Sequence, residues 1–319
     1  MAKEAVLWND VEVNVGWGTL RGKTCVVDGT GLDNDNGLHV VGLHGWLDNC
    51  NTFDNLVPLL PSKTKVLVLD FPGHGWSDHL PLGAHYNPFV YAFNIKTAVL
   101  KLGWKKFILM GHSMGGAVSC VFTAIFPELV SALIIFDYVA PQSTRGFIEQ
   151  CQIYAEDLLK SEKLALEPPL VYSEKEAIDR LIAARVFGYS DDATIDKEAA
   201  QILLPRSAQE VSNGYVWSHD RKARPTFLVF ISGKKWIEII SAIKCPVLLI
   251  QATRGTNMFQ IESLNKIYEV YRRNAQWFSV EIVEGCHHVH LTEPSHVAPS
   301  VTHFLEKVAN RKQPIQARL

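Results

Sequence analysis

One short stretch, Gly111-His112-Ser113-Met114-Gly115, constrains the fold of this chain more than any other. It follows four apolar residues, 107–110, that suit a buried strand, and it precedes an apolar run, 117–126, of helical length. A serine at the centre of such a strand–turn–helix unit adopts a strained backbone, and the flanking glycines leave room because neither has a Cβ. The pattern predicts that the Ser113 hydroxyl stands clear of a sheet, at the N-terminus of the following helix.

Strand and helix patterns alternate on both sides of this unit. An alternating start predicts an N-terminal hairpin, and later apolar runs predict buried strands separated by segments with helical spacing. This alternation predicts an α/β fold with a mostly parallel central sheet flanked by helices. The expected strands are 11–15, 20–27, 38–43, 66–69, 107–110, 132–136, 245–250 and 277–283, and the expected helices around them are 87–102, 117–126, 261–271 and 294–308.

Between Tyr138 and about Ile243 the pattern becomes mainly helical. Ser173-Glu174-Lys175-Glu176 is a capping box, and 194–204 has the character of a helix that we expect Pro205 to stop. We therefore predict a helical cap domain at 142–235, inserted into an α/β core made of 1–141 and 236–319.

Composition narrows the class of protein and of partner. The chain has 319 residues, of which 47% are hydrophobic and 20% charged, with a formal net charge of −2. This profile is typical of a soluble globular protein, and the lack of a basic run argues against nucleic-acid partners. No apolar run has the length of a membrane span or of a signal peptide, so we expect a cytoplasmic protein. The six cysteines are scattered without C-x-x-C spacing, so we expect free thiols.

The C-terminal residues Ala317-Arg318-Leu319 offer an alternative location. They resemble the peroxisomal address Ser-Lys-Leu, with a small, a basic and a leucine residue in order. Import into peroxisomes is therefore the second expectation.

Four ordered motifs resemble those of the α/β-hydrolase superfamily. They are HGW at 44–46, DFPGHGWSD at 70–78, GHSMGG at 111–116 and GCHHVHLTEP at 285–294. Within this superfamily, HGWLDN at 44–49 and the closing HxxHLTEP most resemble the serine hydrolase-like (kraken-type) branch. The resemblance covers nearly the whole chain except the predicted cap, and it implies the α/β-hydrolase fold.

The resemblance also implies roles for individual residues. Ser113 would be the nucleophile, and His287, three residues before His290 in the closing motif, would be its base. His288 is the rival base, whereas His290 is expected to be a structural hydrogen-bonding residue. The backbone N–H groups of Trp46 and Met114 would form the oxyanion hole.

The acid of the triad departs from the superfamily's usual pattern. Most members place an aspartate just after the strand equivalent to 245–251, but here the loop 252–259 contains no carboxylate. Asp137 ends an earlier strand, where some relatives place their acid, and it preserves the chain order serine, acid, histidine. We therefore predict Asp137 as the acid, with Glu262 and Asp48 as weaker candidates.

Other motif residues have a structural and a functional interpretation. Asp70, Gly73, His74 and Gly75 are expected to be structural. The side chains of Trp46, Trp76 and Met114 would line an apolar acyl or ring site, although ordinary packing is the simpler interpretation. Likewise, Trp217, Asp220 and Arg221 would face the cleft or, as the simpler interpretation, stabilise the cap.

These residues predict a carboxylesterase-like serine hydrolase that cleaves an ester, a thioester or a related carbonyl compound through an acyl-enzyme. The substrate would be a small apolar or amphipathic molecule, and no cofactor is expected. The three histidines 287, 288 and 290 raise a metal site as an alternative, but no known zinc spacing accompanies them, so we expect none. The competing hypothesis is a non-hydrolytic protein of the same fold: a cofactor-free oxygenase or luciferase-like protein, a C–C bond enzyme, or a ligand-binding protein that has lost its activity.

Overall fold

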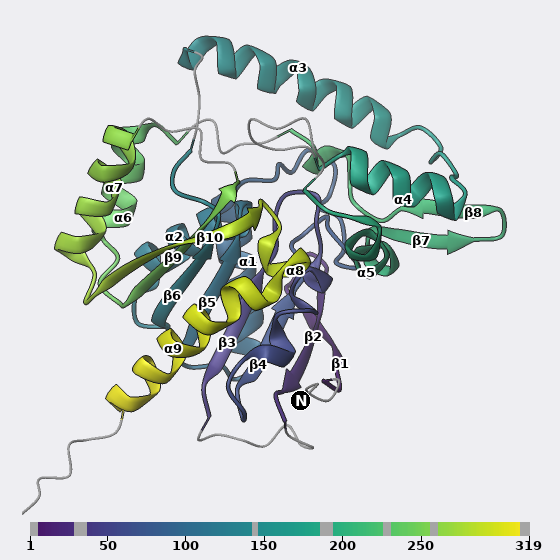
Figure 1. Cartoon of the computed structure of the whole chain (residues 1–319). Helices are drawn as coiled ribbons and strands as arrows, with labels where there is room; N and C mark the ends of the chain where they lie inside the picture. The colour runs from purple at the N-terminus through teal and green to yellow at the C-terminus, as the bar shows by residue number, and fades with distance from the viewer. Residues whose placement is uncertain are drawn as a thin grey trace, which may run out of the picture.

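The computed structural model describes residues 6–28, 37–141, 146–185, 194–225, 231–255 and 261–312. In this part of the chain an eight-stranded sheet forms the centre, in the order β1-β2-β4-β3-β5-β6-β9-β10 (Figure 1). The first strand pairs are antiparallel, and from β4 to β10 all neighbours run parallel. The strands are β1 Asn9–Asn14, β2 Thr19–Val26, β3 His39–Leu43, β4 Lys65–Leu69, β5 Phe107–His112, β6 Val130–Phe136, β9 Val247–Arg254 and β10 Phe278–Cys286. This confirms the predicted α/β fold.

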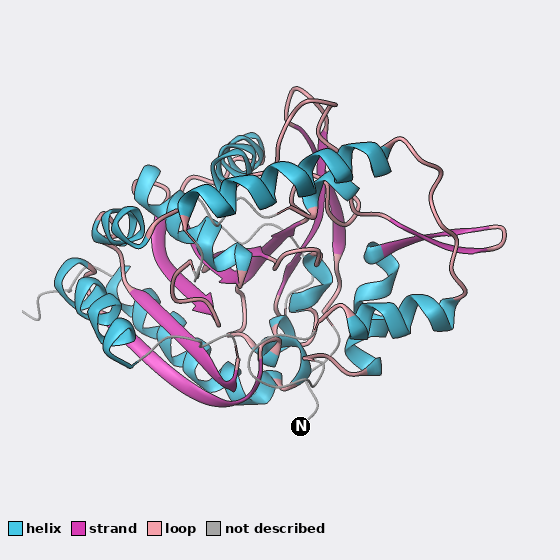
Figure 2. Cartoon of the chain, turned by 90° about the horizontal axis from the view of Figure 1, so that it is seen from above, coloured by secondary structure: helices cyan, strands magenta, loops and turns pink. Residues whose placement is uncertain are grey.

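Helices cover both faces of the sheet (Figures 1 and 2). Successive strand residues point to opposite faces, so Leu109 joins one hydrophobic core while Ile108 and Met110 join the other. On one side lie α1 Pro88–Lys101, α2 Met114–Ile125, α6 Gly233–Ser241 and α7 Ile261–Asn274, and on the other side α9 Pro294–Lys312 with the 3-10 turns η1 Cys50–Phe53 and η2 Val57–Leu59. The parallel strands are therefore buried on both sides, as their continuous apolar sequences require.

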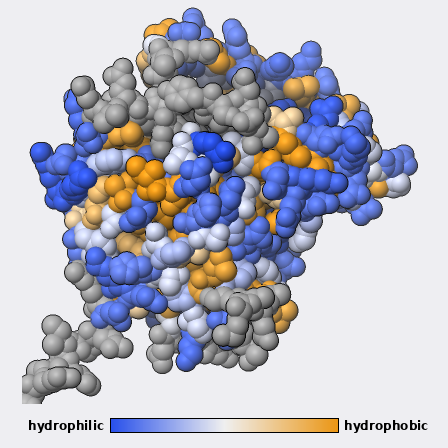
Figure 3. All heavy atoms as spheres, viewed as in Figure 1, coloured by the Kyte–Doolittle hydropathy of each residue, from blue (hydrophilic) through white to orange (hydrophobic). Residues whose placement is uncertain are grey.

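The segment between β6 and α6 lies over the edge where the parallel strands end (Figures 1 and 2). We call its described residues, 146–185 and 194–225, the inserted segment. Its apolar side chains form a small hydrophobic core that also includes Leu291. Its elements are α3 Phe147–Ala165, α4 Glu174–Ala183, α5 Lys197–Ser207, β7 Ala208–Val211, β8 Gly214–Trp217 and the 3-10 turn η3 Arg221–Ala223. On the face seen in Figure 3, apolar side chains gather in a band across the middle of the molecule, below this segment.

Two local predictions for the inserted segment need correction. The expected helix does not stop at Pro205, because α5 continues to Ser207. A proline in the last turn removes only one backbone hydrogen bond, the one that its missing N–H would donate. The Pro205 carbonyl, at the end of the helix, accepts from Trp76 Nε1 at 3.0 Å. The segment also contains the antiparallel pair β7–β8, which the prediction of a helical cap did not include. The capping box is confirmed, with Ser173 N donating to Glu176 Oε2 at 2.8 Å and Glu176 N donating to Ser173 Oγ at 3.3 Å.

Along the described helices, none combines the length and apolar character needed to cross a bilayer. The C-terminal residues 317–319 and the side chain of Glu262 lie outside the described residues.

Candidate active site

Ser113 lies in the sharp turn between β5 and α2. Its backbone has φ 51° and ψ −117°, the strained conformation that the sequence pattern predicts. The turn is held by a hydrogen bond from Ser113 N to Phe136 O at 3.0 Å. A Cβ on Gly115 would lie 2.1 Å from the Leu43 carbonyl oxygen, so only glycine lets α2 approach β3 this closely.

His287 and Asp137 form a buried pair. His287 Nδ1 lies 2.6 Å from Asp137 Oδ2, although the residues are 150 positions apart. Both side chains are at most 2% exposed. His287 lies between β10 and the short helix α8 Val289–Thr292, and Asp137 directly follows β6. The pair therefore joins two loops at the same edge of the sheet.

Backbone geometry around Asp137 aims its carboxylate at His287. Asp137 has φ 48°, and its second oxygen, Oδ1, accepts from Ala252 N at 3.1 Å. Gly255 packs so tightly against this carboxylate that a Cβ there would lie 2.2 Å from Oδ1. The position just after β9, where the superfamily usually has its acid, is thus occupied by a glycine that leaves room for Asp137.

Two residues, Gly45 and His112, lie between Ser113 and the loop that contains His287. A Cβ built on Gly45 would lie 3.5 Å from Ser113 Cβ and 2.9 Å from His112 Nδ1. The His112 ring in turn lies 4.6 Å from the His287 ring, centroid to centroid. The structure therefore brings the Ser113 turn, the Gly45 loop and the His287–Asp137 pair to one end of the sheet.

The two backbone N–H groups predicted to bind an oxyanion belong to Met114, after the Ser113 turn, and to Trp46, in the loop after β3. Met114 is the first residue of α2, so its N–H has no acceptor within the helix. Trp46 follows Gly45, and Leu47 after it has φ 52°. The Trp46 indole donates to Ala223 O of the inserted segment at 3.0 Å, which makes its side chain a contact between sheet and insertion.

The rival residues His288 and Asp48 lie next to each other. His288 Nε2 is 3.7 Å from Asp48 Oδ2, and Asp48 Oδ1 is 3.4 Å from Arg185 of the inserted segment. Burial raises the pKa of Asp48, but the neighbouring His288 ring and Arg185 guanidinium outweigh burial and hold that pKa below its usual range. Burial lowers the pKa of His288 to about 4. Asp48 therefore faces His288, whereas the pair with His287 is made by Asp137.

His290 and the acidic motif around Asp70 have the contacts of structural residues. His290 Nε2 is 2.9 Å from Thr52 Oγ1, and burial lowers the pKa of its ring well below the usual value. Asp70 accepts from the backbone N of Cys50 at 2.7 Å and from Arg206 at 2.7 Å. The Arg206 guanidinium also lies 3.9 Å from the Trp76 ring centroid, so Trp76 is engaged by α5.

The inserted-segment residues singled out from the sequence have partners within the protein. Asp220 Oδ2 accepts from the Tyr86 hydroxyl at 2.6 Å, and Arg221 donates to backbone carbonyls at the end of α3. Trp217 and Arg221 also line a cavity of 520 Å³, together with Leu47 next to Trp46. Three further arginines line it: Arg180, Arg185 and Arg224. This cavity therefore carries positive charge and borders the Trp46 loop.

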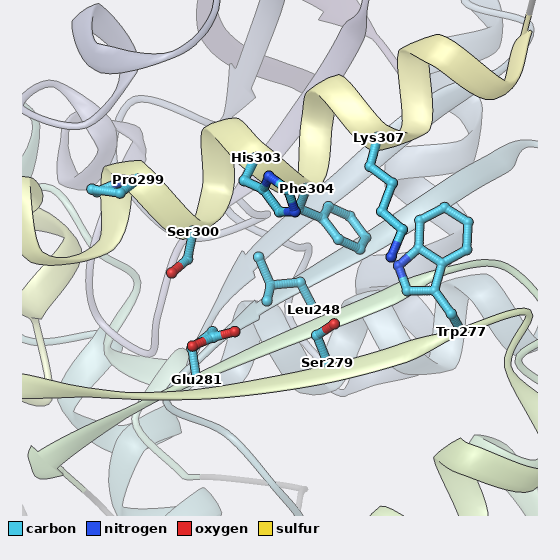
Figure 4. A pocket seen from close by; sticks show the side chains of 9 residues that line it. All are labelled: Leu248, Trp277, Ser279, Glu281, Pro299, Ser300, His303, Phe304 and Lys307. Atoms are coloured by element: carbon cyan, nitrogen blue, oxygen red, sulfur yellow. The ribbon is translucent and has the colours of Figure 1, made fainter.

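A second hollow, of 360 Å³, lies between β10 and α9 (Figure 4). Lys307 Nζ lies 4.9 Å from the centroid of the Trp277 ring at one end of it. None of the predicted catalytic residues lines this hollow, so it is separate from the candidate active site.

The sheet order and the strained serine turn define an α/β hydrolase, and comparisons with known proteins agree. The family model for the alpha/beta hydrolase fold matches residues 39–155. A serine hydrolase-like protein of Danio rerio is 32% identical over 305 residues, which cover 93% of this chain and 88% of the relative. Serine hydrolase-like protein 2 of Homo sapiens is 31% identical over 316 residues, which cover 95% and 93%. The solved structure of a hypothetical protein from Pseudomonas aeruginosa PAO1 has a TM-score of 0.76 at 27% identity and covers 94% of this chain and 99% of that one. The chain belongs to the serine hydrolase-like family of α/β hydrolases.

Sequence reasoning missed several residues that shape the site. Arg185 and Thr194 of the inserted segment reach Asp48 and His288, and no motif marks either of them. The role of Gly255 could have been predicted, because this glycine lies in the loop where the superfamily's usual aspartate is absent.

Proposed function

We propose that the chain is a serine hydrolase in which Ser113, His287 and Asp137 form the catalytic triad. The observation that carries this proposal is the 2.6 Å contact between His287 Nδ1 and Asp137 Oδ2, at the end of the sheet that bears the strained Ser113 turn. Relatives that are named serine hydrolase-like proteins support the same class of reaction.

The proposed mechanism follows from the tautomer of His287. A carboxylate only accepts hydrogen bonds, so Nδ1 of the neutral ring carries the proton and Nε2 carries the lone pair. Nε2 takes the Ser113 proton as Oγ attacks the substrate carbonyl carbon, and Asp137 stabilises the imidazolium that forms. The N–H groups of Trp46 and Met114 stabilise the negative oxygen of the tetrahedral intermediate.

The intermediate then collapses to an acyl-enzyme. His287 donates its proton to the leaving alcohol or thiol, and the ester bond to Ser113 remains. A water molecule attacks this ester with His287 as base, which releases the carboxylic acid and restores the serine.

The substrate is proposed to be an amphipathic ester or thioester that binds between the sheet and the residues 142–235, which would act as its cap. The cavity lined by Leu47 and four arginines lies next to the Trp46 loop and favours a negatively charged group some distance from the scissile carbonyl. Specificity would therefore depend on the inserted segment.

Two series of substrates test this function. Chromogenic esters of increasing acyl length measure hydrolysis, and each is compared with an analogue that ends in a carboxylate. Wild type should hydrolyse at least one ester, Ser113→Ala should abolish that activity, and the carboxylate analogues should have the lower KM. Equal hydrolysis by wild type and Ser113→Ala would refute the role of Ser113.

A further inference from the structure

Next to the proposed triad, three buried side chains bring potential metal ligands together. Asp48, His112 and His288 are 3%, 1% and 3% exposed. One ligand atom from each lies within 4.8 Å of the other two. They come from three separate places: the Trp46 loop, the residue before Ser113 and the residue after His287.

The hydrogen bond of His112 fixes its tautomer. Its Nε2 lies 3.0 Å from the His287 carbonyl oxygen, which can only accept, so Nε2 carries the proton of the neutral ring. The lone pair is then on Nδ1. This atom is buried and has no hydrogen-bond partner among the described residues.

Thr194 lets His288 turn its other ring nitrogen toward Asp48. The Thr194 hydroxyl lies 2.9 Å from the Arg185 carbonyl and 2.8 Å from His288 Nδ1, so it can donate to the carbonyl and accept from Nδ1. His288 Nε2 faces Asp48 Oδ2 at 3.7 Å, and in that tautomer it is the nitrogen that can bind a cation.

Asp48 supplies a second buried acceptor without a partner. Its Oδ1 lies 3.4 Å from Arg185, whereas Oδ2 is buried and has no hydrogen-bond partner within the described part of the chain. Asp48 Oδ2 and His112 Nδ1 are thus two buried acceptors close to each other, and a ring nitrogen of His288 belongs to the same group of ligand atoms. Acceptors that face each other repel unless a donor or a cation lies between them.

We propose that Asp48, His112 and His288 bind a divalent transition-metal ion of the zinc type. Two imidazole nitrogens and one carboxylate oxygen are a ligand set that Zn²⁺ prefers, and a water would complete a tetrahedron. The partner of each ring's other nitrogen, the His287 carbonyl and Thr194, holds the ring in the orientation that a ligand needs. Bonds of about 2.1 Å place tetrahedral ligands roughly 3.4 Å apart, so ligand atoms that lie within 4.8 Å of one another would draw closer by up to about 1.4 Å around the ion.

A buried water is the simpler occupant, because it would donate to both Asp48 Oδ2 and His112 Nδ1. A metal ion would instead bind all three side chains and displace any proton from His288 Nε2. The metal titration below separates these two occupants.

The position of the site predicts an effect on catalysis, and this part rests on the proposed function. His112 is bonded to Ser113 in the chain, and His288 is bonded to His287. Drawing the two rings toward an ion therefore shifts both the nucleophile and its base. We expect the metal to inhibit hydrolysis by lowering kcat, because this shift displaces the reacting groups themselves.

The test titrates the untagged, chelator-treated full chain with Co²⁺ alone. Tetrahedral Co²⁺ with nitrogen ligands absorbs strongly in the visible, so wild type should develop this absorption at one ion per chain, and Zn²⁺ should displace it. Asp48→Asn and His112→Gln should weaken binding by more than the roughly 10–100-fold that loss of a supporting partner costs.

His290→Gln is the matched control. Its ring is buried in the same stack, 4.2 Å from the His112 ring, but it is not a member of the ligand group. This variant should keep the Co²⁺ absorption. Zinc should also raise the Tm of wild type and of His290→Gln but not that of Asp48→Asn, which separates loss of the site from loss of the fold.

The outcomes are distinct. Absence of the absorption in wild type, or its persistence in Asp48→Asn and His112→Gln, overturns the metal site. Binding without any fall in kcat overturns the inhibitory role. A chain that binds Co²⁺ as predicted but hydrolyses no ester supports the site and contradicts the proposed function.

Discussion

Asp137 is the residue on which the proposed triad depends most. Replacing it by asparagine keeps the shape but removes the charge that stabilises the His287 imidazolium, and it allows the wrong tautomer. We predict that Asp137→Asn lowers kcat about 10³–10⁴-fold with an unchanged circular dichroism spectrum. Asp48→Asn, measured in a chelating buffer, should stay within about tenfold of wild type, since Asp48 faces His288. The opposite order of the two variants would make Asp48 the acid.

Gly255 offers a test that leaves the catalytic residues themselves unaltered. The Cβ of Gly255→Ala would lie 2.2 Å from Asp137 Oδ1, so the carboxylate must move away from His287. We predict a fall in kcat of at least about tenfold with little change in KM, as expected when a transition-state interaction is lost. Gly233→Ala is the matched control, because its Cβ meets nothing within 4 Å. Equal kcat values for the two variants would contradict the proposed packing role of Gly255.

For single residues, the sequence predicts the geometry wherever a local pattern determines it. The Ser113 turn is specified by its flanking strand, glycines and helix, and the observed φ of 51° agrees with that pattern. The contact between Asp137 and His287 depends on how β6, β9 and β10 align. Such a register cannot be obtained from residue spacing alone.

Among the elements of the inserted segment, α5 is joined to the sheet domain by a buried ion pair. Arg206, near its end, lies 2.7 Å from Asp70, and both side chains are at most 3% exposed. Replacing Arg206 by methionine leaves a buried carboxylate without its partner, which typically costs about 3–5 kcal/mol. We predict this loss in the free energy of unfolding in urea for Arg206→Met.

The control for this element is Arg272 on α7. It forms an ion pair with Glu269 at 2.8 Å, but both side chains are about half exposed. Exposed pairs contribute about 0–1 kcal/mol, so Arg272→Met should change the unfolding free energy by less than about 1 kcal/mol. A loss of similar size in both variants would mean that the Arg206 pair does not anchor α5.

Element prediction succeeded where a periodic pattern or a cap was present and failed where tertiary contacts decide. The capping box of α4 is an example of the first kind. The strand β8 and the continuation of α5 through Pro205 are examples of the second kind. Tyr215 of β8 pairs with Tyr172, and the Pro205 carbonyl accepts a hydrogen bond from Trp76. Neither partner is close in the sequence.

The whole molecule contains several buried histidines whose titration couples pH to folding. Burial lowers the pKa of six rings: His44, His74, His112, His219 (to about 4), His288 (to about 4) and His290. The unfolded chain takes up these protons near pH 6.5 but the folded chain does not, so stability is lost as pH falls below that value. Each histidine contributes about 1.4 kcal/mol per pH unit in this window.

We therefore predict that the free energy of unfolding in a chelating buffer falls steeply between pH 6.5 and 5, with a slope of more than one proton, and is flat between pH 7 and 8. Urea unfolding at each pH gives this slope directly. The slope should become smaller in His290→Gln, which removes one of the six rings. A pH-independent stability across the acid window would mean that these rings are protonated in the folded protein.

The most direct test of the central claim is covalent labelling by a fluorophosphonate, followed by mass spectrometry of the modified peptide. A serine activated by His287 and Asp137 should react, so the label should be found on Ser113 of wild type at one adduct per chain. His287→Ala should label at least about 100-fold more slowly, in line with the typical contribution of a general base, whereas His290→Gln should label at close to the wild-type rate. Failure of the folded wild-type chain to label, or equal labelling rates in wild type and His287→Ala, would contradict the account.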